Sequence, residues 1–528
     1  MHLPILPRPA NVTDESGTRG PDMWVDEAIW GHRLYDEQTP WLAFLEFLNV
    51  LLSEEAARRA FQEIDGPNTL RYQPHHHLYL RNILFNNPRL LVLLKDVPDD
   101  ETRWTRWFED MAHSADGLGE QPDFSYIRSR FTRFEDFVAI VQLLCLSAVE
   151  GESNKRWTSK FVFPYGPAAL YEDLRVTQHA ITNDRRFFGR VGEVVYLMLC
   201  RSGRNSELLE QLRPLFLTEE TRWNRIVRAL IPPHQDSQVR ERANAYLPYA
   251  ILPEFQQFAD DWLALLRCRI PGYDVTPYLV DVLGLHVLLY KLRCAQAWAT
   301  PGKPLRLVLE MVAPRRTTIR DLAAQTYLNN NQMSSEAIKA YIRHTVEDSP
   351  EWQAALVSPD PFGNAFSVLR RKVAWPPDSD PNTYDGLRTP EGLLRSSDGL
   401  YAAAARRHAS HTANVHARYT REIGLASRRS TNRIRYAPND HIIKSLVLAV
   451  VPHRMEFQQF LQVLYDRYSF VIGHRQANVY IEAGHSDQKA FEDNARRLEM
   501  RLASLGLLKR LSDACAYVEN PYTIQEER

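Results

Sequence analysis

Apolar residues recur at steps of three and four along most of this chain, the spacing that places them on one face of a helix. Trp41, Leu45, Leu48 and Leu52 form one such stripe. The alternation of apolar and polar residues that is typical of strands is nearly absent from the first 300 residues. We therefore predict a mainly α protein, in which residues 304–313 are the clearest strand candidate before the C-terminal end.

The C-terminal residues 441–528 combine apolar spacing, helix stops and basic residues in one unit. Three helices are predicted there, over 441–451, 454–468 and 487–505. Gly506 can adopt the positive φ that ends the third helix, and residues 514–518 have the composition of a short strand. Three helices followed by a turn and a strand is the order of a winged helix-turn-helix, which we predict for this unit.

Basic residues on and after the third predicted helix indicate a nucleic-acid surface. They lie outside its apolar stripe and are Arg496, Arg497, Arg501, Lys509 and Arg510. Neutralising phosphate charge supplies most non-specific affinity for DNA, so these residues are predicted to contact the backbone of double-stranded DNA. The same helix carries the acids Glu492, Asp493 and Glu499. Because they lower its net charge, the partner of this unit is predicted to be either DNA or a protein.

The segment before this unit, residues 376–440, has the composition of an Arg-rich linker. Residues 388–440 contain ten arginines and four acidic residues, with no lysine. Such a segment is either a phosphate-binding arm or a solvated linker. As an arm, it would contribute Arg428, Arg429, Arg433 and Arg435 to the nucleic-acid surface.

A chain of 528 residues is long enough for several domains, and changes in composition divide this one into five segments. They are a loose arm (1–22), a helical domain (23–150), a helical domain with few short strands (151–375), the Arg-rich linker (376–440) and the C-terminal domain (441–528). Within the second helical domain, Asn329–Asn331 are predicted to form a polar turn between two helices.

Two further stretches offer local chemistry. Residues 151–174 mix aromatic residues with lysine and arginine, which would suit either a nucleic-acid clamp or an ordered loop packed on helices. Arg185, Arg186 and Arg190 cluster before a strongly apolar predicted helix, and Glu193 is the only acid among them, so Glu193 is expected to form an internal ion pair.

Motifs of catalysis and metal binding are few. The chain has no phosphate-binding loop, dinucleotide fingerprint or nucleophile elbow. Arg406 and His411 match the R-x4-H spacing of one class of metal-independent ribonucleases, in which histidine moves a proton. His75–His77 are consecutive, so on a helix they would diverge by about 100° and could not share one ion. We predict no metal site and no cofactor.

Overall composition points to the cytoplasm. The net charge is −1, so attraction to nucleic acid would have to come from a local patch. Five widely spaced cysteines without a C-x-x-C pair are expected to be reduced thiols. No secretory signal is evident, and no apolar run reaches the roughly 18 residues needed to cross a membrane.

Three stretches carry a resemblance to known proteins: IWGHRLYDEQTPWLAFLEFL from Ile29, KRWTSKFVFPYGPAALYEDL from Lys155 and RRFFGRVGEVVYLML from Arg185. They resemble large proteins of bacterial phage-defence islands, nearest to the accessory components of methylation-associated defence systems. The resemblance implies an antiviral context and a subunit that works beside methyltransferases, ATPases and nucleases. It carries no catalytic residue to this chain.

Together these features predict a non-enzymatic DNA-binding or adaptor subunit of a multi-protein antiphage defence complex. One alternative is a nuclease or toxin effector that uses Arg406 and His411. Another is a structural scaffold whose winged helix docks a partner ATPase.

Overall fold

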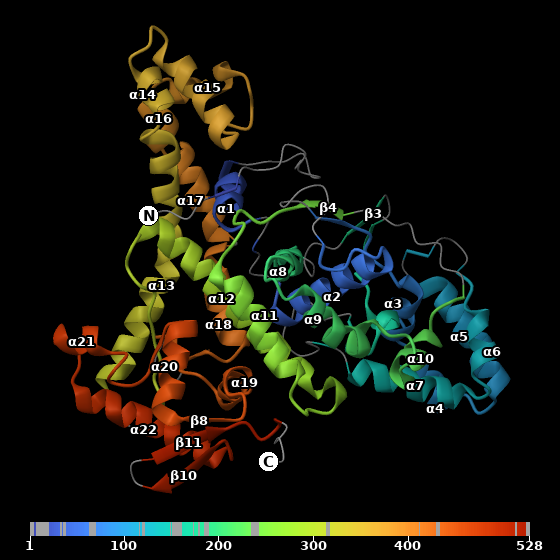
Figure 1. Cartoon of the computed structure of the whole chain (residues 1–528). Helices are drawn as coiled ribbons and strands as arrows, with labels where there is room; N and C mark the ends of the chain where they lie inside the picture. Colours follow the sequence, from blue (N-terminus) through green and yellow to red (C-terminus); the bar gives the residue numbers. More distant parts are fainter. Residues whose placement is uncertain are drawn as a thin grey trace.

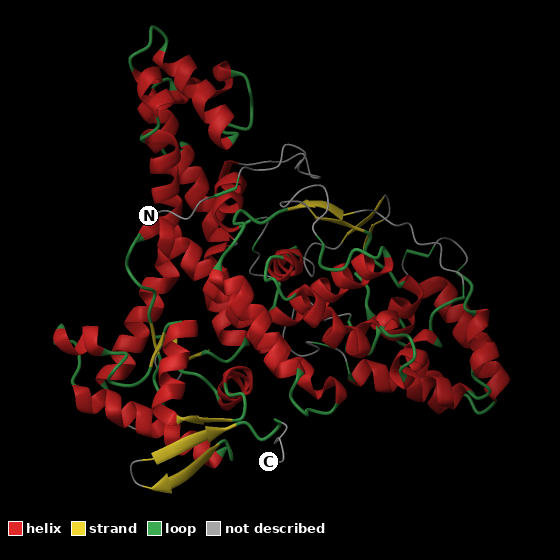
Figure 2. Ribbon diagram, viewed as in Figure 1, coloured by secondary structure: helices red, strands yellow, loops and turns green. Residues whose placement is uncertain are grey.

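The computed structural model describes most of the 528 residues. The described ranges are 5–6, 21–31, 34, 38–62, 70–115, 117–118, 122–147, 149, 161–172, 174–177, 180–183, 189–233, 242–312, 317–410, 412–428, 433–512 and 515–523. Helices dominate, and the strands are few and short (Figure 2). The prediction of a mainly α protein is therefore confirmed. Most buried apolar side chains from Val25 to Val518 form one continuous core, so the predicted segments share their interior. A smaller cluster lies where Val308, Ile319 and Ala323 meet Val471, Ala477 and Phe491.

The N-terminal half folds into a helical lobe (right side of Figure 1). Its helices are α2 (Pro40–Ala56), α3 (Leu78–Phe85), α4 (Leu90–Asp96), α5 (Asp100–Ser114), α6 (Ser125–Arg130), α7 (Phe134–Leu146), α8 (Val191–Cys200), α9 (Asn205–Leu212) and α10 (Arg222–Arg228). Two short helical turns, η1 (Pro167–Ala169) and η2 (Arg213–Leu217), belong to the same lobe. At the crossing of α2 and α8, a Cβ on Gly192 would lie 2.6 Å from the Ala43 carbonyl oxygen. Only glycine therefore allows the two helices to pack at this distance.

Three long helices form the centre of the molecule. They are α11 (Pro253–Leu266), α12 (Thr276–Ala299, preceded by η3, Gly272–Val275) and α13 (Thr318–Ile342, continued by η4, Arg343–Glu347). The stretch Gly272–Ala299 is long and apolar enough to cross a membrane, but 89% of its most apolar window is buried inside the protein. Its apolar surface is thus used by core contacts, as expected of a central helix.

A helical projection extends from the far end of α13 (top of Figure 1). It contains α14 (Pro350–Leu356), α15 (Pro361–Val373), η5 (Pro381–Leu387) and α16 (Pro390–Arg395). The chain returns along α13 as α17 (Leu400–Ser410) and α18 (Thr412–Glu422), and α17 also packs against α1 (Pro21–Trp30). The segment expected to be a linker therefore contains two helices of the body, because apolar residues such as Leu400, Ala404 and Tyr419 are buried there.

The C-terminal unit, residues 440–523, follows (lower left of Figure 1). Its elements are α19 (Asp440–Val450), β8 (Arg454–Glu456), α20 (Phe457–Tyr468), β9 (Phe470–Val471), α21 (Asn478–Glu482), α22 (Gln488–Ser504), β10 (Leu508–Ser512) and β11 (Cys515–Glu519). The strands β10, β11 and β8 form an antiparallel sheet in that order. The predicted helices 441–451 and 487–505 and the strand at 514–518 are confirmed, whereas the helix predicted from 454 begins only after β8.

The remaining strands form two-stranded pairs. They are β1 (Leu70–Tyr72) with β4 (Arg242–Ala245), β2 (Leu174–Thr177) with β3 (Ala180–Asn183), β5 (Leu307–Val308) with β9, and β6 (Ala426–Ser427) with β7 (Arg435–Tyr436). The strand candidate 304–313 thus contributes two residues, which pair in parallel with the C-terminal unit.

The polar turn predicted at Asn329–Asn331 is wrong, because α13 runs through it without a break. Asn330 is buried, and its side-chain amide donates to the Tyr436 hydroxyl at 3.1 Å and to the Arg306 carbonyl at 3.1 Å. These tertiary partners satisfy the polar group that would otherwise favour a turn.

Candidate nucleic-acid interface

The position of α22 in the C-terminal unit is set by burial of one face. Phe491, Leu498 and Leu502 are buried, as their spacing predicts, and the Asp487 side chain accepts from the Ala490 N–H to cap the first turn. Asn494 connects the helix to the body. Its amide donates to the carbonyls of Leu309 (2.9 Å) and Ile472 (3.0 Å), and its oxygen accepts from the Met311 N–H (2.8 Å).

The opposite face of α22 is open to solvent. Arg496 is exposed there and lies 3.6 Å from Asp493, a pair that exposure to water makes weak. Arg497 is partly buried. In the described part of the chain, Arg497 forms no ion pair. Its charge is therefore available for an external anion.

Arg501 and Arg510, which the sequence assigns to DNA, are both held by carboxylates of the protein. Arg501 pairs with Asp440, and its Nη1 donates to the Pro438 carbonyl at 2.8 Å. Arg510 donates to Glu499 at 2.8 Å. Arg501 therefore fixes the start of α19 against α22, and Arg510 fixes the β10–β11 hairpin to the same helix.

The hairpin presents a second exposed cation. Lys509 is exposed on β10 opposite Tyr517 on β11, and it has no ion-pair partner among the described residues. On the neighbouring strand β8, the Arg454 guanidinium lies 3.8 Å from the centre of the Tyr517 ring. This cation–π contact stiffens the base of the hairpin.

Exposed apolar side chains lie on the same two elements. Met500 of α22 is 67% exposed, and Leu511 of β10 is 56% exposed. Residues 440–523 contain equal numbers of acidic and basic residues, ten of each. The surface of the unit is thus electrically balanced, with local cations beside apolar atoms.

The four arginines predicted before this unit have different surroundings. Arg435 is 3% exposed and its guanidinium pairs with the buried Glu310, so its assignment to a phosphate is wrong. Arg428 and Arg433 are exposed, and Arg428 has an interaction within the protein. Arg429 lies outside the described residues.

The ribonuclease-like spacing gains no support from the described residues. Arg406 is exposed on α17 and donates to the Ser397 carbonyl at 2.7 Å. His411 lies outside the described residues. No metal-binding group of three or more His, Cys, Asp or Glu side chains is found among the residues that the structure describes.

The aromatic residues of 151–174 pack on the lobe wherever they are described. Phe163 lies beside Trp41, and Tyr165 stacks on Trp223 with ring centres 4.6 Å apart. Residues 151–160, which carry the basic part of the stretch, lie outside the described residues.

The lobe contains a buried cluster of charged side chains, of which the sequence predicted only the ion pair of Glu193. Glu46, Glu172 and Glu193 are wholly buried around the guanidinium of Arg242, which lies 2.8 Å from Glu172. Arg190 pairs with Glu193 at 2.7 Å, which confirms the predicted internal ion pair. Burial, reinforced by the negative charge of Glu193, raises the pKa of Glu46 to about 8.

A second buried cluster surrounds Lys291 of α12. Its Nζ donates weakly to Ser334 Oγ at 3.4 Å, and the His408 Nε2 lies 3.1 Å from the same oxygen. Asp26 of α1 lies 3.6 Å from His408 Nδ1. Burial lowers the pKa of Lys291 to about 7, and the negative charge of Asp26 opposes this effect.

Ser334, His408 and Asp26 are in contact one after another, as serine, histidine and aspartate are in a hydrolytic triad. Their surroundings do not suit catalysis. Ser334 is 1% exposed and His408 is 2% exposed, so a substrate cannot reach them. Ser334 also lies inside α13, where backbone N–H groups are engaged in helix hydrogen bonds and cannot stabilise an oxyanion. The cluster is therefore a buried structural network.

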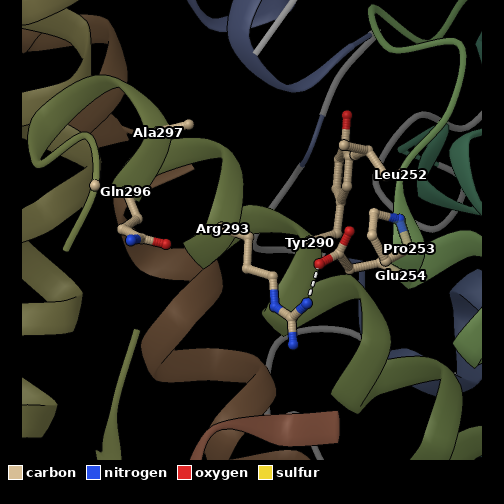
Figure 3. Close-up of a pocket in the computed structure, with 8 residues that line it drawn as sticks. Leu252, Pro253, Glu254, Tyr290, Arg293, Gln296 and Ala297 are labelled. Carbon is tan, nitrogen blue, oxygen red and sulfur yellow. Dashed lines mark hydrogen bonds and ion pairs between the residues drawn. The ribbon is translucent and has the colours of Figure 1, made fainter. Parts of the chain in front are cut away.

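A small cavity of about 240 Å³ lies beside the start of α11 (Figure 3). Its charged side chains, Glu254 and Arg293, form an ion pair with each other. Arg293 Nη2 also donates to the Arg467 carbonyl at 2.7 Å. Because α12 is joined here to the end of α20, the cavity belongs to the junction between body and C-terminal unit.

Comparison of this chain with protein-family models, with curated proteins and with solved structures finds no significant match.

Proposed function

We propose that the C-terminal unit is a winged helix that binds the backbone of duplex DNA, and that the chain is a non-enzymatic subunit of a multi-protein antiphage defence complex. In this proposal α22 is the helix offered to DNA, and the β10–β11 hairpin is the wing. The helical body serves as the adaptor that contacts the other subunits. The defence context comes from the resemblance of the three sequence stretches.

The observation that carries the DNA proposal is the presence of unneutralised cations on two adjacent elements. Arg497 on α22 and Lys509 on the hairpin form no ion pair with described residues, and Arg496 has only a long, exposed one. Arg501 and Arg510 are excluded from the contact set because carboxylates of the protein hold them. The proposed phosphate contacts are therefore Arg496, Arg497 and Lys509.

The test uses the full-length protein and a fluorescently labelled DNA duplex. Wild-type affinity is expected to fall steeply between about 50 and 200 mM salt. A triple variant, Arg496→Ala with Arg497→Ala and Lys509→Ala, should weaken binding and reduce the slope of log K against log salt by about 2 to 3, since each lost phosphate contact removes roughly 0.9.

Arg371→Ala provides the matched control, because Arg371 is an exposed arginine on α15, in the projection at the other end of α13. It should leave affinity and slope unchanged. Equal binding by wild type and the triple variant would exclude these residues as the DNA contacts.

A protein partner is the second candidate for the same surface, favoured by the exposed Met500 and Leu511 and by the balanced charge of the unit. Such a surface would dock a neighbouring subunit, for example an ATPase, through apolar contact. Met500→Glu with Leu511→Glu should then abolish co-purification with products of neighbouring genes. If wild type shows no salt-dependent DNA binding but this double variant loses its partner, the docking function replaces the DNA function.

A further inference from the structure

A groove of about 420 Å³ lies between α7 and α10 in the helical lobe, far from the C-terminal unit in Figure 1. It is lined by Phe131, Ile140, Arg222, Arg225, Ile226 and Ala229. Its volume falls within the range of about 300 to 1,000 Å³ that is typical of small-molecule sites.

The groove follows from helical spacing on its two walls. One wall is a single face of α10 and its C-cap, because residues 225, 226 and 229 lie three, four and seven positions after Arg222. On α7, Leu143 lies one turn after Ile140 and is 42% exposed, which extends the apolar wall beyond the groove. The floor is therefore apolar, and charge enters only from Arg222 and Arg225.

These two arginines differ from the others in this part of the lobe. Arg228 pairs with Glu219, and Arg133 pairs with Glu135. Arg130 donates to the backbone carbonyl of Ala229 at 2.9 Å. Arg222 and Arg225, by contrast, are exposed, and neither side chain has an ion pair or hydrogen bond among the described residues.

We propose that this groove binds a free anionic amphiphile, a small molecule with an acyl chain or aromatic ring and one carboxylate, sulfonate or phosphate. Phe131, Ile140 and Ile226 would contact its apolar part. The anionic head would lie between the guanidiniums of Arg222 and Arg225, which suit planar, bidentate recognition of an oxyanion.

Charge complementarity and size distinguish this occupant from a macromolecule. Two arginines beside apolar lining residues match a molecule with a single anionic group and an apolar part. A nucleic acid would need a longer row of cations along the groove. A short α10, from Arg222 to Arg228, offers a wall of only two turns, which is sufficient for a small molecule.

Isothermal titration of the full-length protein with dodecanoate, below its micelle concentration, tests the proposal. Arg222→Gln with Arg225→Gln should raise the Kd at least tenfold, because both charged hydrogen bonds are lost. Ile140→Trp should also raise the Kd at least tenfold by filling the apolar floor while keeping both charges. Arg228→Gln, on the same helix but outside the groove, should change the Kd less than twofold.

Dodecyltrimethylammonium, which has the same chain and the opposite charge, should bind at least tenfold more weakly than dodecanoate. Circular dichroism confirms that each variant is folded. The proposal is overturned if the double Gln variant binds dodecanoate as wild type does, or if the cationic amphiphile binds as tightly. It is also overturned if the protein binds only vesicles of anionic lipid and not the free amphiphile.

Discussion

Lys291 has an amine that is fully buried and has no carboxylate at ion-pair distance in the described structure. Its pKa is about 7 in the folded protein, against 10.5 for the free side chain. Between these values the unfolded chain binds a proton that the folded chain does not. The free energy of unfolding therefore rises with pH between about 7 and 10.5. The burial of Lys291 is most destabilising at and below pH 7.

Lys291→Met should raise the free energy of unfolding at pH 7 by about 2 to 4 kcal/mol, because the desolvated amine is replaced by an apolar side chain of similar length. The gain should shrink towards zero as the pH approaches 10.5. Urea denaturation at both pH values measures it, with the exposed Lys303→Met as control. A gain that is the same at both pH values would show that ionisation of Lys291 is not its cause.

Arg242 is the opposite case, a buried cation on which three buried carboxylates depend. Arg242→Met should lower the free energy of unfolding by about 3 to 5 kcal/mol, since it leaves uncompensated buried charge. Because burial raises the pKa values of Glu46 and Glu172, those groups ionise as the pH rises, and the loss should be larger at pH 8 than at pH 5.

Thermal unfolding at the two pH values tests this dependence. Arg213→Met is the control, because Arg213 forms an exposed ion pair with Glu55 whose loss should cost less than about 1 kcal/mol.

At the residue scale, sequence reasoning succeeds where the partners are close in the chain. Glu193 lies within eight positions of three arginines, so an ion pair could be predicted for it, and the structure shows that its partner is Arg190. Glu310 lies 125 positions before Arg435, and nothing local distinguishes that arginine from the exposed Arg433. The number of charged residues is known from the sequence, but which of them form ion pairs within the folded protein is not.

Among the elements, α22 is attached to the body by its buried apolar face and by one buried amide, that of Asn494. Asn494→Ala would remove three hydrogen bonds of 2.8 to 3.0 Å. The carbonyls of Leu309 and Ile472 and the N–H of Met311 would each lose this partner. Each unsatisfied group costs about 1 to 3 kcal/mol, so we expect α22 and residues 307–311 to loosen together. Faster amide hydrogen exchange at Met311 and in α22 measures the effect.

Asn478→Ala is a suitable control, because that exposed asparagine donates its side-chain amide to the exposed Glu482 within α21 and not to the body, as far as the described residues show. Unchanged exchange at Met311 in the Asn494 variant would show that the strand pair β5–β9 holds the unit without the amide.

The long helices of the C-terminal unit could be located from the sequence, whereas the shortest strands could not. Asn439 and Asp487 cap α19 and α22, and both helices were located from the sequence. The pairs β5–β9 and β6–β7 have two residues in each strand, too short for alternation to reveal. The break predicted in α13 is wrong because the partners of Asn330 lie outside α13, 24 positions before it at Arg306 and 106 positions after it at Tyr436.

For the whole molecule, the C-terminal unit is expected to depend on the body for its fold. α19 packs on α11 and α12, and Asp261 of α11 accepts from the Tyr468 hydroxyl at 2.7 Å. Residues 440–523 produced alone should therefore lose cooperative thermal unfolding, because the buried face of α19 would be exposed. Circular dichroism during heating measures this, and a sharp transition in the isolated unit would contradict it.

The same dependence is visible within the segment predicted to be a linker, residues 376–440. Composition located a change near residue 376, but Leu400, Ala404 and Val415 are core residues between the Pro-rich stretch and the C-terminal unit. The Ala- and Arg-rich character of α17 and α18 arises because each has one buried face on α1, α12 or α13 and one solvated face.

The hydrogen bond between Thr412 and Asp26 joins positions 386 residues apart, and it has a consequence for synthesis. A ribosome adds about 5 to 20 residues per second, so α1 waits roughly 20 to 80 s before the end of α17 and the start of α18 emerge. During that interval the apolar side chains of Val25, Ile29 and Trp30 have no completed core to enter. We therefore expect α1 to be packed long after it is made, and a nascent chain of this protein to bind chaperones that recognise exposed apolar segments.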